Sequence, residues 1–342
     1  MECEDGTSSI RSVESKTCNL KSPISNFQGW GLIYFWILFN LFALTMLIVD
    51  LRVLHRPGHV IKFREAVGWS VMYVALAALF AALLYFWQGR QAGLEFVAGY
   101  VVELSLSVDN LFIFLVIFNY FAVPEEQQHR VLFWGILGAL VLRGIFIAAG
   151  VGLINRFHWL LFVFGALLIY SGIRVCVTGE HQVDPASNPV VKALRKWIPV
   201  TEEYHGGQFF LRKREENGRL YATPLLVVLL VIETTDVLFA VDSIPAILAI
   251  TLKAFIVYTS NVFAILGLRS MYFAVSGLMK LFRFLHYGLA IILIFVGAKM
   301  LLGDYVDIPI LLTLGVVAAV LLISIVLSIA FPLKDAERSS RN

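Results

Sequence analysis

Long apolar runs separated by short polar segments make up most of this chain of 342 residues. Nine runs hold about 20 residues or more, the length that an α-helix needs to cross the hydrocarbon core of a bilayer. We therefore expect an all-α polytopic membrane protein with about nine transmembrane helices. The expected spans are residues 29–50, 67–88, 94–120, 130–153, 158–178, 221–249, 254–276, 283–302 and 308–331.

Composition supports this class and excludes others. Hydrophobic residues make up 59% of the chain and charged residues 15%, against about 25% charged residues in a soluble domain. The net charge of +3 is spread over the loops and predicts no binding of nucleic acid. Cys3, Cys18 and Cys176 have neither metal-binding nor redox spacing. The polar N-terminal tail, residues 1–28, lacks the apolar core of a cleaved signal peptide.

Positive charge predicts how the spans are oriented. Lys and Arg residues concentrate in the segment after the first span, in the loop 179–220 and in the C-terminal tail 333–342. Cytoplasmic loops carry such an excess, so we expect all three segments inside the cell. The N-terminus is then outside and the C-terminus cytoplasmic, with a transmembrane domain over residues 29–332.

The loop 179–220 carries two local patterns. From Pro189 to Ile198, apolar residues at helical spacing predict a short helix that lies on the membrane surface. Farther on, QFFLRK and RLYA flank the segment 215–218, which favours a β-hairpin. The alternative is that this loop forms a regulatory flap over the inner mouth of a transporter.

Two of the apolar runs contain acids in a repeated pattern. The segments 101–118 and 231–247 align so that Glu103 matches Asp236 and Asp109 matches Asp242. Ionisable groups inside a membrane span cost several kcal/mol each, so they point to a functional site.

The repeat extends beyond the acids. Arg143 in GILGALVLRGIFI matches Arg269 in NVFAILGLRSMYF, and the run that starts at His158 resembles the run that starts at His286. A unit of three spans begins its second copy on the other side of the membrane. We therefore expect a 3+3 inverted-topology repeat of residues 94–178 and 221–302, with a substrate site at the midplane between the copies. The remaining three spans are additions around that core.

Counting charges within the spans predicts the chemistry of this site. Acids outnumber the arginines that could pair with them, and three carboxylates would each need a proton or a cation. Carboxylate, hydroxyl and amide oxygens suit hard divalent ions such as Mn²⁺, Mg²⁺ or Ca²⁺. The predicted metal ligands are Glu103, Asp109, Asn110, Glu233, Asp236, Asp242 and Ser243, and the predicted charge-pairing residues are Arg143 and Arg269.

Helical periodicity leaves the place of two acids open. Glu103, Ser107 and Asn110 share one helix face, and Asp236 and Ser243 share the equivalent face. On an unbroken helix, Asp109 and Asp242 lie on a different side of their helices from those faces. Either they meet a different neighbour or the helix unwinds locally, and Pro245 favours unwinding in the second copy because it lacks a donor for the carbonyl of Val241. Asn261 is a weaker candidate for the pathway, and His158 and His286 are expected to anchor their helices at the interface.

These motifs resemble the TerC family of integral membrane proteins, which is named for tellurium resistance and has Alx-like members. The resemblance is carried by VELSLSVDNLFIF, ETTDVLFAVDSIPAI, SNVFAILGLRSMYF and YGLAIILIFVGAKML. It implies a bacterial plasma-membrane (inner-membrane) protein that exports manganese, and it implies functional acids at Glu103, Asp109, Glu233, Asp236 and Asp242.

The function expected from the sequence is therefore export of a hard divalent ion, most readily Mn²⁺. Buried carboxylates that release a metal must take up protons, so proton coupling is a natural counterpart. The ion is substrate, and no permanently bound cofactor is expected. The alternative is a membrane scaffold or stress-response subunit that transports nothing, in which the acids only pair with the arginines. We expect no enzyme, since no nucleophile with a base and no HExxH-type metal motif occurs.

Overall fold

The computed structural model describes most of the apolar part of the chain. The described backbone covers residues 24–54, 63–178, 191–193, 196, 198–201, 203–204, 206–213, 219–276, 284–303, 305–306 and 308–330. Side chains are described for the same residues except 24–33, 50–54, 109, 178, 213, 219–220 and 275–276. Cys3 and Cys18 fall outside these ranges, and so do several residues of the surface helix expected from Pro189 to Ile198.

Each of the nine expected spans is a helix. The helices are α1 (Ile24–Leu54), α2 (Phe63–Trp87), α3 (Arg90–Tyr120), α4 (Glu125–Arg156), α5 (Leu160–Thr178), α7 (Pro224–Leu248), α8 (Ala254–Ser276), α9 (Leu285–Leu302) and α10 (Ile310–Ala330). Within the described residues, eight helices are long and apolar enough to cross a membrane, and Tyr34–Val49 in α1 is a shorter apolar helix. The predicted all-α polytopic architecture is confirmed.

Local chemistry explains where several helices begin. Gly89 separates α2 from α3 with a φ of 96°, which a residue without a Cβ adopts at low cost. Pro124 precedes α4, whose first turn carries Glu125 and Glu126 near the positive end of the helix dipole. Pro224 opens α7, where its missing N–H costs nothing.

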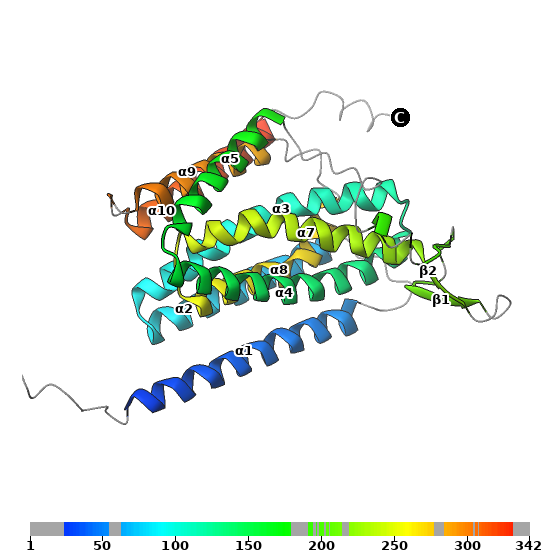
Figure 1. Ribbon diagram of the computed structural model, residues 1–342, viewed down its shortest axis with the longest axis horizontal. Helices are drawn as coiled ribbons and strands as arrows, with labels where there is room; N and C mark the ends of the chain where they lie inside the picture. Colours follow the sequence, from blue (N-terminus) through cyan, green and yellow to red (C-terminus); the bar gives the residue numbers. More distant parts are fainter. Residues whose placement is uncertain are drawn as a thin grey trace, which may run out of the picture. The chain divides into compact units, whose positions relative to one another are not determined.

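The structure divides after Thr45 into two units, residues 1–45 and 46–342. In the second unit α3 packs against α7 and α8, α4 packs against α7 and α8, and α5 packs against α9 (Figure 1). Each helix of the expected first repeat thus meets helices of the expected second repeat. A twofold relation would produce these pairings, and the inverted orientation of the two repeats stays a prediction.

Glycines bring α5 and α9 into backbone contact. A Cβ on Gly297 would lie 2.7 Å from the carbonyl oxygen of Gly165, and a Cβ on Gly165 would lie 3.0 Å from the carbonyl oxygen of Gly297. Small residues allow such close approach between membrane helices, where packing drives association. Beside this contact an apolar cluster that includes Leu106, Leu168 and Leu293 joins α3, α5 and α9.

The predicted β-hairpin is confirmed. Strands β1 (Phe210–Lys213) and β2 (Arg219–Ala222) pair antiparallel, with Phe210 opposite Ala222. The segment before β1 is fastened to the ends of two helices: Arg130 Nη1 donates to the carbonyl of Gly207 at 2.7 Å, and the Tyr204 hydroxyl donates to the carbonyl of Phe121 at 2.8 Å. Burial raises the pKa of the Tyr204 phenol, which keeps this group protonated as a donor.

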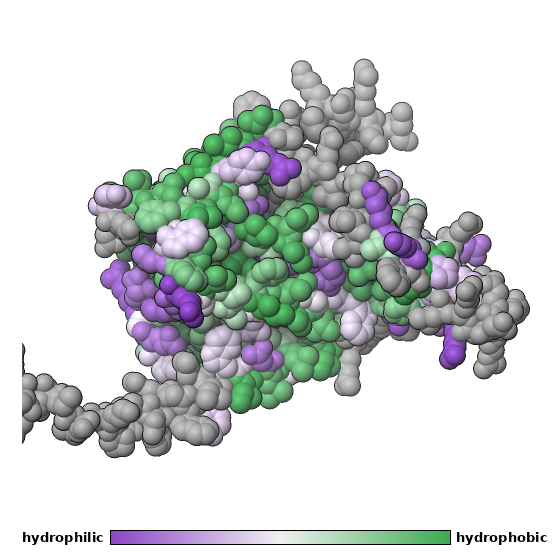
Figure 2. Space-filling model, viewed as in Figure 1, coloured by the Kyte–Doolittle hydropathy of each residue, from purple (hydrophilic) through white to green (hydrophobic). Residues whose placement is uncertain are grey.

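Apolar side chains cover the visible middle of the helices. Figure 2 shows hydrophobic residues gathered along them, with hydrophilic residues toward the helix ends at the left and right of the view. Leu79, Val141, Leu238 and Leu322 are each more than half exposed. Such an apolar surface suits contact with lipid, as expected of a polytopic membrane protein.

Candidate functional site

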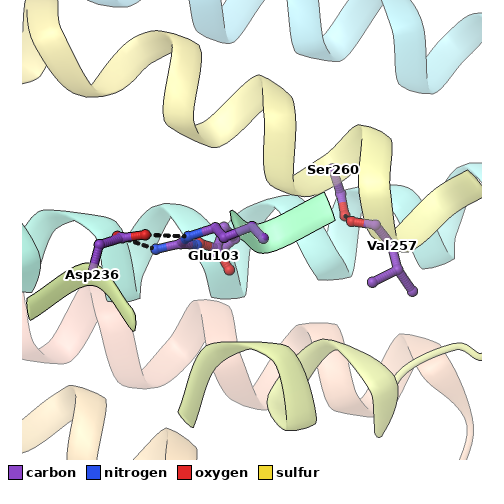
Figure 3. A network of polar contacts seen from close by, with 5 residues as sticks. Glu103, Asp236, Val257 and Ser260 are labelled. Carbon is purple, nitrogen blue, oxygen red and sulfur yellow. Dashed lines mark hydrogen bonds and ion pairs between the residues drawn. The ribbon is translucent and has the colours of Figure 1, made fainter. Parts of the chain in front are cut away.

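Arg143 of α4 binds two carboxylates at the centre of the second unit. Its Nε and Nη2 donate to Oδ2 and Oδ1 of Asp236 in α7 at 3.2 and 2.9 Å. Its Nη1 donates to Oε1 of Glu103 in α3. Figure 3 shows the Asp236 and Glu103 side chains close together in this network. We call Glu103, Arg143 and Asp236 the charged triad.

The triad joins residues that the repeat aligns. Glu103 and Asp236 hold matching positions in the two acidic segments, and the structure brings them to the same guanidinium. The expected bidentate pairing is found with Asp236, while pairing of the same arginine with Glu103 was not anticipated. The side chains of Arg143 and Glu103 are 1% and 0% exposed.

With both carboxylates ionised, the triad places net negative charge at a buried position. Two ionised carboxylates against one guanidinium give a net charge of −1. Burying charges costs several kcal/mol each, and removing one partner of a buried pair costs roughly 3–5 kcal/mol. Glu103 Oε2 has no hydrogen-bond partner among the described residues. The site therefore favours a further proton or cation.

On the same helix faces, some buried hydroxyl and amide groups also lack hydrogen-bond partners among the described residues. Most buried hydroxyls here donate to a carbonyl of their own helix, as Thr235 and Thr259 do, and as Ser260 does to Val257 (Figure 3). The hydroxyls of Ser107 and Ser243 have no such bond within the described chain. Buried polar groups are otherwise nearly always satisfied, so these oxygens are available to a ligand.

Two amide side chains extend this polar set. Asn110 of α3 is 2% exposed, Asn261 of α8 is 1% exposed, and the Nδ2 atom of each is buried without a partner among the described residues. Both belong to helices that pack against each other. Asn110 shares the inward face of α3 with Glu103 and Ser107, as its spacing predicts.

Glu233 is not a member of the triad, and its carboxylate lies against α4. A Cβ on Gly138 would lie 2.5 Å from the Glu233 carboxyl carbon, so a larger residue at this position would make the carboxylate move. Glu233 Oε2 is buried without a partner in the described structure. The side chain is half-buried and stands three residues before Asp236 in α7.

Asp242 meets a neighbour that the sequence did not identify. The hydroxyl of Ser171 in α5 donates to its Oδ1 at 2.7 Å. The alternative expectation, that the helix unwinds near Pro245, is wrong, because α7 stays helical from Pro224 to Leu248 with Pro245 inside it. The proline falls in the last turn, where the loss of one hydrogen bond interrupts little of the helix.

The other two predicted site residues are placed less fully. The backbone of Asp109 belongs to the continuous helix α3, and its side chain lies outside the described part. Arg269 of α8 is 1% exposed, like Arg143. Among the described residues no three His, Cys, Asp or Glu side chains come together closely enough to hold a metal ion. The predicted ligands thus lie along several helix faces in this conformation.

Sequence reasoning missed a buried acid near the start of α3. Glu95 is 6% exposed, accepts a hydrogen bond from Thr251 at 2.8 Å and pairs with Lys253 at 3.1 Å. The signal was present, since Lys253 is one of few cations in the segments expected outside. Ser171 and Gly138 were also missed, and neither residue type stands out in an apolar run.

A cavity of about 870 Å³ opens at the end of the helices opposite the hairpin. It lies between the ends of α3, α5, α7, α9 and α10, and its lining includes Arg90, His158, Thr251 and Lys299. His158, expected to be an interfacial anchor, therefore borders an open space. The ring centroid of His286 lies 4.0 Å from that of Tyr287.

Comparison with known proteins gives close relatives. Residues 88–336 match the integral membrane protein TerC family. The uncharacterized membrane protein STKORF319 of Myxococcus xanthus is 49% identical over 294 residues, which are 86% of this chain and 91% of that protein. Proteins described as the membrane-bound redox modulator Alx are 47% identical in Salmonella typhi and 44% identical in Escherichia coli K12, each over 302 residues, 86% of this chain and 93% of theirs. No solved structure matches.

Proposed function

Because the chain belongs to the TerC family of integral membrane proteins, we propose that it is a transporter that exports a hard divalent cation, with Mn²⁺ as the principal substrate. The observation that carries this proposal is the charged triad, a buried set of two carboxylates and one guanidinium between helices of the two expected repeats. Net negative charge at such a place is costly unless the protein uses it.

The oxygen chemistry supports a hard cation as substrate. Glu103, Asp236 and the hydroxyl of Ser243 supply the ligand type that Mn²⁺, Mg²⁺ and Ca²⁺ prefer. The unpartnered hydroxyl of Ser107 and the amide of Asn110 continue the same polar face of α3. Asp109 and Asp242 then serve as further oxygen sites along α3 and α7, so that the ion passes from one site to the next instead of resting in one cage.

Orientation and coupling complete the proposal. The hairpin end faces the cytoplasm, the end with the cavity faces outward, and the protein lies in the bacterial inner membrane. Carboxylates that release the ion outward take up protons there, which would couple export to inward proton movement.

A membrane scaffold is the rival function, and one observation favours it. Arg143 ties α3, α4 and α7 together through its three hydrogen bonds, which a purely structural role would also explain. A scaffold does not need unpartnered oxygens on the inward faces of α3 and α7, however, and these remain in the described structure. The two functions differ in metal flux.

The decisive experiment measures cellular manganese after a Mn²⁺ load in a sensitive host. Cells expressing the wild type should hold less manganese than cells expressing Asp109→Asn or Asp242→Asn at equal membrane abundance. Glu126→Gln is the matched control, because it removes an exposed carboxylate from the first turn of α4. Equal manganese in wild-type and mutant cells, repeated with Ca²⁺ and Mg²⁺ loads, would favour the scaffold.

A further inference from the structure

The Arg143 guanidinium lies where a cation shared by the two repeats would lie. Three of its N–H groups are used by the two repeat-related carboxylates, the Nε and Nη2 edge by Asp236 and Nη1 by Glu103. A divalent ion that binds Glu103 and Asp236 together must contact the same oxygens. The guanidinium and the ion therefore compete for one position.

We propose that Arg143 is a tethered cation that holds the Glu103–Asp236 site while no metal is bound and leaves it when the metal enters. This inference rests on the proposed transport of a divalent cation. It assigns Arg143 the role of an internal competitor, which sets the affinity for the ion and promotes its release.

Electrostatics makes the two occupants exclusive. Two carboxylates with a divalent ion alone sum to zero, whereas adding the guanidinium would leave a net charge of +1 at a buried position. Uncompensated charge at low dielectric is costly, so the ion enters as the guanidinium withdraws. When the ion leaves, the returning guanidinium restores partners to both carboxylates.

Glu233 is positioned to receive the withdrawn guanidinium. It lies three residues before Asp236, so the two carboxylates are neighbours on α7. It rests on Gly138, which precedes Arg143 in α4 by five residues, roughly 7.5 Å along the axis. Arg143 and Gly138 both contact α7, at Asp236 and at Glu233, and five residues place them about 140° apart around α4. The buried Oε2 of Glu233, without a partner among the described residues, is the free acceptor.

The test measures Mn²⁺ affinity of the purified full-length protein in lipid nanodiscs, from the electron paramagnetic resonance signal of free Mn²⁺. Arg143→Gln removes the competitor and should bind Mn²⁺ about tenfold more tightly or better, while efflux from loaded vesicles falls. Arg143→Lys keeps a tethered charge and should stay closer to wild type. Arg130→Gln, which removes an exposed arginine at the hairpin end, should leave the affinity unchanged.

A double variant tests the part of Glu233. If Glu233 acts by receiving Arg143, Glu233→Gln should weaken Mn²⁺ binding in the wild-type background and have no effect in the Arg143→Gln background. If Glu233 binds the ion directly, it should weaken binding equally in both, and that result would overturn its assignment as acceptor. Such a cycle separates the two because it measures the coupling between the two side chains.

The outcomes separate this inference from the transport function. If the wild type binds Mn²⁺ and the Arg143→Gln variant binds it no more tightly, the role of Arg143 as competitor is overturned. The proposed transport function then still stands. A wild type without affinity for Mn²⁺, Ca²⁺ or Mg²⁺ would overturn both. If the Arg143→Gln variant is unstable, added Mn²⁺ should raise its melting temperature more than it raises that of the wild type. An equal or smaller rise in the variant would also overturn the role of Arg143 as competitor.

Discussion

Glu233 of α7 and Gly138 of α4 fit together as carboxylate and cradle, with the place of a missing Cβ 2.6 Å from Glu233 Oε2. Neither residue was linked to the other by the sequence, since they stand far apart in the chain. The contact explains why α4 carries a glycine in the middle of a membrane helix, where it would otherwise only weaken the helix.

Gly138→Ala should therefore displace the Glu233 carboxylate without removing it. We expect manganese efflux to fall severalfold, with membrane abundance reduced only modestly, because alanine favours the helix but leaves no room for the carboxylate. Gly152→Ala in the same helix is the control, since a Cβ there meets no atom within 4 Å. Equal efflux in both variants would remove Glu233 from the pathway.

The Ser171–Asp242 hydrogen bond gives a second prediction. Ser171→Ala removes one donor to a half-buried carboxylate, which costs about 1 kcal/mol and should reduce efflux moderately. Asp242→Asn keeps the shape but loses the charge and should abolish efflux at near-normal abundance. Vesicle transport assays at matched protein levels compare the two. Full loss in Ser171→Ala with normal activity in Asp242→Asn would reverse the roles assigned to this pair.

Backbone contact between α5 and α9 predicts a stability effect. Gly297→Val should destabilise the protein by about 2 kcal/mol or more, because a side chain at this position overlaps the carbonyl of Gly165 and side-chain atoms of α5. Thermal unfolding in detergent measures the loss. Gly315→Val in α10, where a Cβ would meet nothing within 4 Å, should change the melting temperature far less.

The Glu95–Lys253 pair allows a test of buried against exposed charge. Glu95 is buried, whereas the Lys253 side chain is 54% exposed. Lys253→Met leaves the buried Glu95 carboxylate with Thr251 as its hydrogen-bond donor among the described residues. This change should cost more stability than Glu95→Gln, in which the amide can still accept from Thr251. The melting temperatures of the two variants decide the order, and the reverse order would show that Glu95 is effectively neutral.

Much of the architecture was predictable from hydropathy alone. Each long helix that the structure describes overlaps an expected span, and the hairpin follows from the turn residues between QFFLRK and RLYA. Transmembrane spans can be predicted from sequence because each one must satisfy its own backbone hydrogen bonds as a helix inside the membrane. The two acidic segments could also be recognised from the sequence, because charged residues within an apolar run are too costly to occur by chance.

The sequence by itself determined the membrane class, the spans and the candidate acids. Only the tertiary structure decided which residues these acids contact. Glu103 and Asp236 both bind Arg143. Glu233 contacts Gly138, and Asp242 accepts a hydrogen bond from Ser171 on an unbroken helix. Periodicity assigns a side chain to a face of its own helix. Its partner depends on the rotation and depth of the neighbouring helices, which are set by packing over many side chains and by close contacts such as that of Gly165 with Gly297.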